Sequence, residues 1–507
     1  MTRRSLALAA LSGLLLAASF PSLGYSFLAW IALVPLLFAL RDQTVRTGLW
    51  LSGCFGLVFF CGTVYWVTDS IHIYGHVPLL PASFITLLLC VILALFIVPF
   101  GGALVHIRAT HPRLLFLAAP ALWVTLEYAR THLFSGFPWA LLGYSQYRSL
   151  PVIQIADLLG VYGISFLIVL VNTGIAEVLA DRKRYLPPLA AAVMTAAVVG
   201  YGFYRLNAPE GAGSIRIAVV QGNIEQDKKW DPSYQSEVIA TYQRLTLKAL
   251  EQRPDLVIWP ETATPFYFLG IDAPYPALTE DLRRFVRSSG TPLLFGSATY
   301  DKKDRRYLLR NSAFFLDKTG AIDDIYIKHH LVPFGEYVPL KNSLLFFADK
   351  LVHGSGDFVA GNEYTVAGVQ SAANGRNILL STVICYEIIF PDLVRRFVNN
   401  GATVMTTITN DAWFGRTGAP YQHFSMAVLR AVENHVPIAR AANTGISGFI
   451  DAKGRILETT DIFTEAYLTR SLSPSTKKTI YTRYGDVFAW LCVLVTIAAV
   501  LPRLRRT

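Results

Sequence analysis

The segment Thr382-Val383-Ile384-Cys385-Tyr386-Glu387-Ile388-Ile389-Phe390-Pro391-Asp392 joins a strand pattern to a helix pattern at one cysteine. Residues 378–384 are mostly apolar and rich in β-branched side chains, which predicts a buried strand. A helical pattern follows over residues 388–397, and Gly401 marks its end. Cys385 is therefore predicted on a strand-to-helix turn, where the positive end of a helix dipole favours a thiolate. A buried cysteine that packs as a small hydrophobic side chain is the alternative.

The composition of the chain points to a membrane protein. The 507 residues are 53% hydrophobic and only 16% charged, whereas a soluble protein has about 25% charged residues. Four of the five cysteines lie in apolar runs, which argues against a secreted disulfide framework: Cys54, Cys61, Cys90 and Cys492. Cys385 alone lies in the one long polar region.

Apolar runs that approach the ~20 residues needed to cross a bilayer recur along the first 204 residues. The segment 79–106 is long enough to tilt or to include an interfacial piece. We predict a helical bundle over 1–204, a separate domain over 205–485, and a last span with a basic cytoplasmic tail over 486–507. The expected spans lie near 5–21, 25–40, 48–68, 79–106, 114–130, 158–180, 186–204 and 486–502.

Basic residues in the predicted loops give an orientation. If the spans alternate, one side of the membrane carries Arg3, Arg4, Arg41, Arg46, Arg108, Arg113, Arg182, Lys183, Arg184, Arg503, Arg505 and Arg506. The other short loops hold chiefly Arg130 and Arg148. The positive-inside rule then places both termini in the cytoplasm and residues 205–485 outside. The net charge of +10 is thus mainly a topology signal, and we expect no nucleic-acid partner. Residues 1–21 also resemble a signal peptide, but a retained span is favoured.

Two features of the membrane half leave alternatives open. Glu127 and Arg130 lie at helical spacing near the end of a span. Charges in a membrane are often functional, but a local stabilising pair is the favoured interpretation. The aromatic loop 134–139 suits either an interfacial belt or part of a lipid portal.

Strand and helix patterns alternate after residue 214, which predicts a layered α/β domain. Strands are expected at 215–220, 255–259, 292–295, 311–316, 322–327, 403–408, 438–442, 446–450 and 456–458, and helices at 234–250, 278–289 and 421–434. Polar residues follow four of the apolar strands: Glu261, Lys328, Cys385 and Asn410. Ligand sites of open α/β sheets favour such strand ends.

These residues suit acyl transfer through a cysteine. A cysteine nucleophile needs a base, and Glu261, directly after an apolar strand, is expected to be half-buried with a raised pKa. Lys328, beside the N–H groups that follow Cys385, is suited to stabilise an anionic tetrahedral intermediate. Glu336 is placed to orient Lys328 or to assist proton transfer. A lone Glu or Lys is ordinarily a solvated surface charge, but each of these adjoins an apolar strand.

Three motifs resemble the Glu-Lys-Cys signature of the nitrilase (carbon–nitrogen hydrolase) superfamily: Trp259-Pro260-Glu261, the segment from Lys328 to Glu336, and Cys385-Tyr386-Glu387. With the membrane half included, nearly the whole chain resembles the bacterial apolipoprotein N-acyltransferase family. The further matching segments are Phe137-Pro138-Trp139, Gly143-Tyr144-Ser145-Gln146, Gln221-Gly222-Asn223-Ile224, Trp230 and Asn410-Asp411-Ala412-Trp413-Phe414-Gly415.

The resemblance implies an αββα sandwich over residues 205–485 and a two-step reaction. Cys385 would take an acyl chain from a phospholipid as a thioester. The α-amino group of the diacylglyceryl-modified N-terminal cysteine of an apolipoprotein would then accept it. Glu261 would be the base and Lys328 the oxyanion stabiliser, supported by Glu336, Tyr386, Glu387, Trp230, Asn410 and Trp413. No metal or soluble cofactor is implied. We expect a monomer in the bacterial inner membrane with its catalytic domain in the periplasm.

Residues 341–358 contain Leu344, Leu345, Phe346 and Phe347, which are unfavourable to expose to water. We predict a lid that dips into the outer leaflet, with packing onto the domain as the alternative.

Two other functions remain to be weighed. A membrane-tethered amidase or nitrilase would use the same triad with water as acceptor. A transporter or receptor would have Gly- or Pro-broken spans and would not need Cys385.

Overall fold

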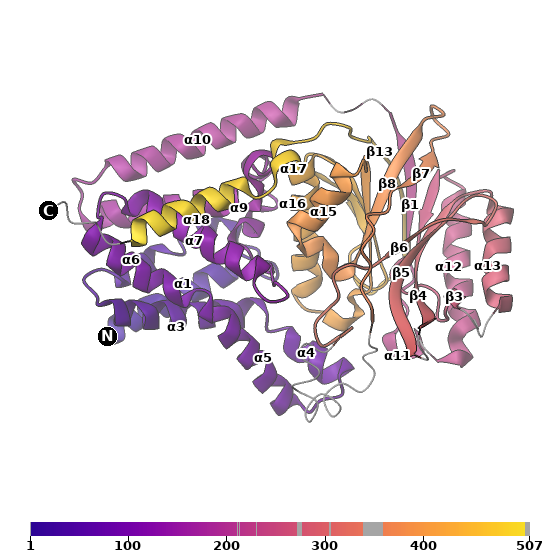
Figure 1. Cartoon of the computed structure of the whole chain (residues 1–507), viewed down its shortest axis with the longest axis horizontal. Helices are drawn as coiled ribbons and strands as arrows, with labels where there is room; N and C mark the ends of the chain where they lie inside the picture. Colours follow the sequence, from indigo (N-terminus) through magenta and orange to yellow (C-terminus); the bar gives the residue numbers. More distant parts are fainter. Residues whose placement is uncertain are drawn as a thin grey trace. The chain divides into compact units, whose positions relative to one another are not determined.

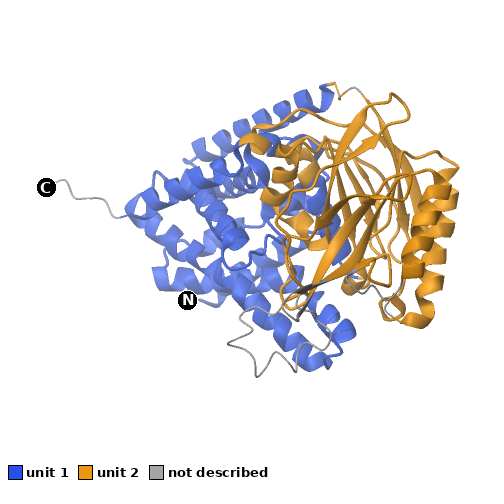
Figure 2. Ribbon diagram, turned by 45° about the vertical axis from the view of Figure 1, so that its right-hand side comes forward, with its two compact units in different colours: residues 1–208, 417–429, 484–507 blue, residues 209–416, 430–483 orange. Residues whose placement is uncertain are grey.

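The computed structural model describes residues 2–209, 211, 213–229, 231–270, 276–303, 306–337 and 358–501. The chain divides into two compact units (Figure 2). The helical unit comprises residues 1–208, 417–429 and 484–507, and the sheet unit comprises residues 209–416 and 430–483.

The helical unit is built from apolar helices. Among the described residues, four helical runs are long and apolar enough to cross a membrane: Val45–Thr63, Leu79–Thr110, Ala156–Ala180 and Leu186–Asn207. The helices of this unit are α1 (Arg3–Ala18), α2 (Val34–Ala39), α3 (Val45–Thr63), α4 (Val67–Asp69), α5 (Leu79–Leu95), α6 (Val98–Thr110), α7 (Leu115–His132), α8 (Leu150–Ile153), α9 (Ala156–Ala180), α10 (Leu186–Asn207) and α18 (Val487–Val500).

Two of the predicted spans are divided in the structure. The predicted span 25–40 is a 3-10 turn, Ser26–Trp30, followed by the short helix α2. The segment 79–106 becomes α5 and α6, which are separated at residues 96–97. Pro35 and Pro99 stand in the first turns of α2 and α6. Proline lacks an N–H group, so it fits the first turn of a new helix better than the interior of a long one.

Glu127 and Arg130 on α7 both bind the main chain of the loop that follows. Arg130 Nη1 donates to the carbonyl oxygens of Phe137 at 2.9 Å and Trp139 at 2.5 Å. Glu127 Oε1 accepts from the N–H of Leu142 at 2.6 Å. Both side chains are buried, so these charges satisfy loop groups that would otherwise lack partners.

The sheet unit contains two sheets. The seven-stranded sheet has the order β13-β1-β2-β4-β5-β6, with β3 paired to β4, and the six-stranded sheet has the order β12-β11-β10-β9-β8-β7. The strands of the first sheet are β1 (Ile215–Gln221), β2 (Leu256–Ile258), β3 (Leu269–Gly270), β4 (Leu293–Lys303), β5 (Arg306–Leu316), β6 (Ile322–Ile327) and β13 (Ala466–Leu472). Those of the second are β7 (Ala367–Gln370), β8 (Asn377–Ile384), β9 (Val404–Thr409), β10 (Ile438–Ala442), β11 (Gly448–Ile450) and β12 (Ile456–Thr459).

Helices cover the outer face of each sheet (Figure 1). α12 (Gln235–Leu250) and α13 (Pro276–Ser289) lie against the first sheet. Their buried core with that sheet includes Tyr242, Leu245, Val286, Trp259, Phe295 and Phe314. α15 (Pro391–Asn399) and the last turn of α16 (Ala419–Asn434) lie on the side of the second sheet. The layers therefore follow the helix–sheet–sheet–helix order that the resemblance implies.

The directions of the strands place the predicted polar residues at one edge of the two sheets. β6 is antiparallel to β5, which is antiparallel to β4, so β6 runs in the same direction as β4. β1, β2 and β4 are parallel neighbours, as are β8, β9 and β10. Four residues follow the C-terminal ends of β2, β6, β8 and β9, respectively: Glu261, Lys328, Cys385 and Asn410.

Candidate active site

Cys385 follows β8 directly and has a left-handed backbone conformation, with φ of +53°. Left-handed conformations are unfavourable for residues other than glycine and are concentrated at functional sites. The predicted helix is divided into a 3-10 turn, Cys385–Ile389, and α15, which begins at Pro391. The prediction that the thiol faces the start of an α-helix is therefore wrong, because that helix begins six residues later.

The surroundings of Cys385 favour the neutral thiol. Burial raises the pKa of Cys385, and the negative charge of Glu261 raises it further. Lys328 lowers the pKa, Asp411 raises it, and a hydrogen bond with Thr409 lowers it. The balance keeps the thiol protonated near neutral pH. The thiolate expected from the sequence is therefore not the resting form, and the sulfur needs a base to become a nucleophile.

Glu261 is a buried carboxylate held on both oxygens. Asn311 Nδ2 donates to Oε1 at 2.8 Å, and the main-chain N–H of Asn410 donates to Oε2 at 2.9 Å. The side chain is 10% exposed, so it is more deeply buried than the half-buried position predicted. These two hydrogen bonds fix the orientation of the carboxylate at the edge of the sheets.

Lys328 is a buried ammonium group between two carboxylates. Its Nζ lies 2.9 Å from Glu336 Oε1 and 3.7 Å from Glu261 Oε1. Burial opposes the charge, but Glu336 and Glu261 outweigh burial and raise the pKa of Lys328 above its usual range. Lys328 therefore remains a cation, and it also lies within electrostatic range of Cys385.

Asn311 on β5 links the two carboxylates and was missed from the sequence. Its Nδ2 donates to Glu261 Oε1 and to Glu336 Oε1, each at 2.8 Å. Its main-chain oxygen accepts from the N–H of Lys328 at 2.9 Å. An asparagine at the start of the predicted strand 311–316 was the only available signal.

Glu387 ties the Lys328 loop to the Cys385 turn. Its carboxylate is fully buried and accepts hydrogen bonds at 2.7–3.0 Å from four donors: Ile384 N, His329 N, His330 N and Tyr326 Oη. Burial raises the pKa of Glu387 to about 7, although the hydrogen bonds and Lys328 oppose the shift. Glu387 therefore fixes the main chain beside the candidate nucleophile relative to the main chain beside the candidate oxyanion stabiliser.

The raised pKa of Glu387 predicts a pH dependence of stability. Its pKa rises from 4.5 to about 7 on folding, so the folded state binds more protons than the unfolded state between these values. The wild-type protein should therefore lose stability, by roughly 3 kcal/mol, as pH rises through this window. Glu387→Gln cannot ionise, so its Tm should change less between about pH 5 and about pH 8. Parallel wild-type and variant profiles of Tm against pH would contradict this assignment.

The other predicted residues differ in placement. The ring of Tyr386 is buried beside Phe390, with 5.2 Å between ring centroids. Asn410 contacts Glu261 through its main-chain N–H, as described above. Trp413 lies on the turn Asp411–Phe414 after β9 and is 43% exposed. Trp230 and, except for Phe358, the predicted lid at 341–358 lie outside the described residues.

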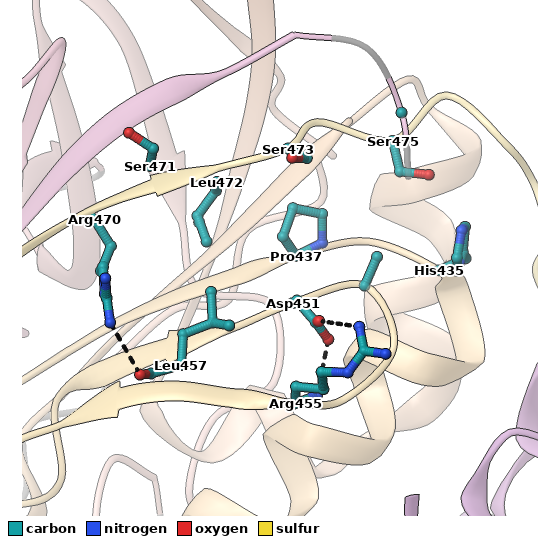
Figure 3. A pocket seen from close by; sticks show the side chains of 12 residues that line it. His435, Pro437, Asp451, Arg455, Leu457, Arg470, Ser471, Leu472, Ser473 and Ser475 are labelled. Carbon is teal, nitrogen blue, oxygen red and sulfur yellow. Dashed lines mark hydrogen bonds and ion pairs between the residues drawn. The ribbon is translucent and has the colours of Figure 1, made fainter. Parts of the chain in front are cut away.

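A cavity of about 390 Å³ lies elsewhere in the sheet unit (Figure 3). Its lining includes Arg455 and Arg470 but none of the predicted site residues. Arg455 Nη1 lies 3.3 Å from Asp451 Oδ2, and Arg470 Nε lies 2.9 Å from Glu458 Oε2. Each arginine thus has a carboxylate partner, and the candidate chemistry lies with Glu261, Lys328 and Cys385.

Comparisons with known proteins cover both halves of the chain. Residues 12–174 match the apolipoprotein N-acyltransferase N-terminal domain, and residues 216–481 match the carbon-nitrogen hydrolase family. The apolipoprotein N-acyltransferase of Geobacter metallireducens is 44% identical over 500 residues, which cover 97% of this chain and 94% of the relative. The apolipoprotein N-acyltransferase of Haemophilus influenzae is 33% identical over 98% of this chain and 95% of the relative. The apolipoprotein N-acyltransferase of Pasteurella multocida is 31% identical over 94% of this chain and 91% of the relative.

Proposed function

This chain belongs to the apolipoprotein N-acyltransferase family, and we propose that Cys385 carries the acyl group between its two lipid substrates. The family resemblance stated from the sequence is confirmed, and the function it implies is lipoprotein N-acylation. The observation that carries the catalytic assignment is that the buried Glu261 and Lys328, with Oε1 and Nζ 3.7 Å apart, both act electrostatically on the partly buried Cys385.

In the first step, Glu261 takes the proton from the Cys385 thiol and the sulfur attacks the carbonyl carbon of a phospholipid acyl ester. The carbonyl oxygen becomes an oxyanion, which the ammonium of Lys328 stabilises. When the tetrahedral intermediate collapses, the C–O bond breaks and Glu261 returns its proton to the leaving oxygen. The products are a thioester on Cys385 and a lysophospholipid.

In the second step, the neutral α-amino group of the diacylglyceryl-modified N-terminal cysteine attacks the thioester carbonyl. Glu261 takes a proton from the attacking nitrogen, and Lys328 again stabilises the oxyanion. The C–S bond breaks, the sulfur leaves and is reprotonated by Glu261, and an amide is formed. Both half-reactions therefore use the same three side chains, which corresponds to a ping-pong sequence.

The long apolar helices support a protein embedded in a membrane. We propose that this is the bacterial inner membrane, with residues 205–485 in the periplasm, 1–204 and 486–507 forming the membrane part, and the protein acting as a monomer. The orientation rests on the asymmetric distribution of arginine and lysine among the loops.

Purified enzyme in mixed micelles, given a phospholipid and a diacylglyceryl peptide, tests the proposal. We expect N-acylated peptide and lysophospholipid in equal amounts, and no peptide product from Cys385→Ser. Without peptide, we expect a lysophospholipid burst equal to the amount of enzyme. Continuous release of free fatty acid, with the peptide left unmodified, would instead indicate a hydrolase.

Gly296 on β4 offers a test of how tightly Glu261 is placed. A Cβ at this position would lie 2.6 Å from Glu261 Cα and 2.7 Å from Thr262 N. The main-chain oxygen of Gly296 accepts from the N–H of Ala263 at 2.8 Å, and the N–H of Gly296 donates to the main-chain oxygen of Pro260 at 3.1 Å. Gly296→Ala must therefore displace Glu261, and we expect the acyl-transfer rate to fall by roughly 10- to 100-fold.

A matched control for this substitution is Gly200→Ala on α10, where an added Cβ meets nothing within 4 Å. Acyl transfer should be unchanged by this control. Wild-type acyl-transfer rates in Gly296→Ala would mean that the position of Glu261 does not limit the reaction.

A further inference from the structure

Lys229 is a buried lysine that the mechanism above does not use. It is the last residue of α11 (Gln226–Lys229), the residue is 1% exposed, and its Nζ donates to the main-chain oxygen of Glu261 at 2.9 Å. The adjacent Lys228 has a 44% exposed side chain and lies 3.2 Å from Glu225. Of these two consecutive lysines, Lys228 thus lies at the surface and Lys229 lies in the site.

The environment of Lys229 is unfavourable for a cation unless anions face it. Burial lowers the pKa of Lys229 to about 8, while Glu261 and Cys385 act in the opposite direction. Its one hydrogen bond is to a neutral carbonyl, and no carboxylate lies within ion-pair distance of Nζ in the described part of the chain. A buried ammonium without a paired carboxylate is rare, so this position requires an explanation.

The segment that carries Lys229 is anchored to the ends of β9 and β10. Asn443, after β10, accepts from the N–H of Ile224 through its side-chain oxygen at 2.9 Å and from that of Asn223 through its main-chain oxygen at 2.9 Å. Asn410, after β9, donates from Nδ2 to Gln226 Oε1 at 2.8 Å. Asn410 also donates its main-chain N–H to Glu261, so the end of β9 helps to place both Lys229 and Glu261.

Lys229 balances the charge of the site. Two carboxylates, Glu261 and Glu336, lie near Lys328, which supplies one positive charge and is closest to Glu336. Lys229 supplies the second positive charge. When the Cys385 proton moves to Glu261, the negative charge moves from the carboxylate to the sulfur, and Lys229 interacts electrostatically with both groups.

We propose that Lys229 is a positioning residue of this site, which fixes the main chain of Glu261 and supplies a second positive charge that stabilises the Cys385 thiolate. Its importance for catalysis rests on the proposed function. Its effect on the thiol does not, because ionisation of Cys385 can be measured without either substrate.

The test is the pH dependence of Cys385 alkylation by iodoacetamide in the full-length protein, followed by peptide mass. Besides Lys229, the charged groups that act on the sulfur are Glu261, Lys328 and Asp411, and all three are unchanged in these variants. Lys229→Met should slow alkylation at neutral pH by roughly 10-fold, the effect of a pKa shift of about one unit. The two rates should converge above about pH 9, where Lys229 of the wild type is itself neutral.

Two further variants sharpen the comparison. Lys229→Arg keeps the positive charge and should alkylate within roughly threefold of the wild type at every pH. Lys228→Met removes the neighbouring exposed charge and should give the wild-type profile. If Lys229→Met cannot be purified in folded form, Lys229→Gln provides a neutral side chain for the same comparison.

A profile for the neutral variant that superimposes on the wild type would overturn the proposal. This holds even if acyl transfer falls, because that result would leave Lys229 only a structural role. Failure of the proposed function would appear differently, as acyl transfer that persists in Cys385→Ser.

Discussion

Glu261→Gln is expected to slow acylation of Cys385 by roughly 10³-fold, within the range that general-base catalysis contributes. The pKa of the thiol is raised by burial and by Glu261 itself, so the sulfur is protonated near neutral pH when no base acts on it. Glutamine has nearly the same shape as glutamate but cannot accept a proton. The rate of lysophospholipid release in the first turnover measures the effect.

The loss should become smaller as pH rises, because hydroxide can then ionise the thiol directly. Glu458→Gln is the matched control, since this carboxylate is 39% exposed and pairs with Arg470 instead of a site residue. It should leave the first turnover unchanged. A wild-type first-turnover rate in Glu261→Gln near neutral pH would show that Glu261 is not the base.

Lys328→Met should abolish acyl transfer and also destabilise the sheet unit. The ammonium lies between Glu336 at 2.9 Å and Glu261 at 3.7 Å, and its side chain is 1% exposed. Its removal leaves the buried Glu261 and the partly buried Glu336 without their nearest cation, and the loss of one partner from a buried pair costs about 3–5 kcal/mol. We expect a lower Tm and a fall in activity of at least 10³-fold, because oxyanion stabilisation is lost as well.

The double variant Lys328→Met/Glu336→Gln separates the two effects. Because it removes one of the uncompensated carboxylates, it should recover a large part of the lost Tm. It should remain inactive, since the proposed oxyanion stabiliser, Lys328, is still absent. A double variant as unstable as the single variant would show that Glu336 is not the main partner of Lys328.

Local sequence patterns predicted most of the sheet unit. The strand expected at 403–408 is β9, Val404–Thr409, and the helix expected at 234–250 is α12, Gln235–Leu250. Such elements have clear periodicity and clear ends. β7 and β13 were missed because both are edge strands, and their part-exposed sequences lack a continuous apolar run.

The membrane half shows where apolar length misleads. Residues 25–40 are apolar enough for a span, but the structure divides them into a 3-10 turn and a short helix. Hydropathy reports that a segment avoids water, and it does not report whether hydrogen bonding continues along one helix. Proline in the first turn of α2 is the local signal of that division.

The candidate site could be predicted only as separate residues. Glu261, Lys328 and Cys385 each end an apolar strand, so their positions were visible in the sequence. Which residues connect them depends on pairing between strands that are distant in the chain. Asn311 and Lys229 contact Glu261 from β5 and α11, and no local pattern distinguishes them from ordinary strand and surface residues.

The protonation of Cys385 illustrates the same limit. A strand-to-helix turn predicted a stabilised thiolate, but the first turn after Cys385 is a 3-10 turn. Burial and the nearby carboxylate of Glu261 raise the pKa of the thiol. The net field depends on three-dimensional distances from Glu261, Lys328 and Asp411. The structure therefore corrects the expected thiolate, and the base expected from the sequence is still needed.

Intact-mass analysis of the purified protein after exposure to phospholipid tests the central claim most directly. We expect one added acyl mass per chain, located on Cys385 by peptide mapping, absent from Cys385→Ser, and removed when a diacylglyceryl peptide is supplied. An acyl-transferring enzyme that acquires no such mass, or that acquires it equally in Cys385→Ser, would contradict a covalent carrier at this sulfur.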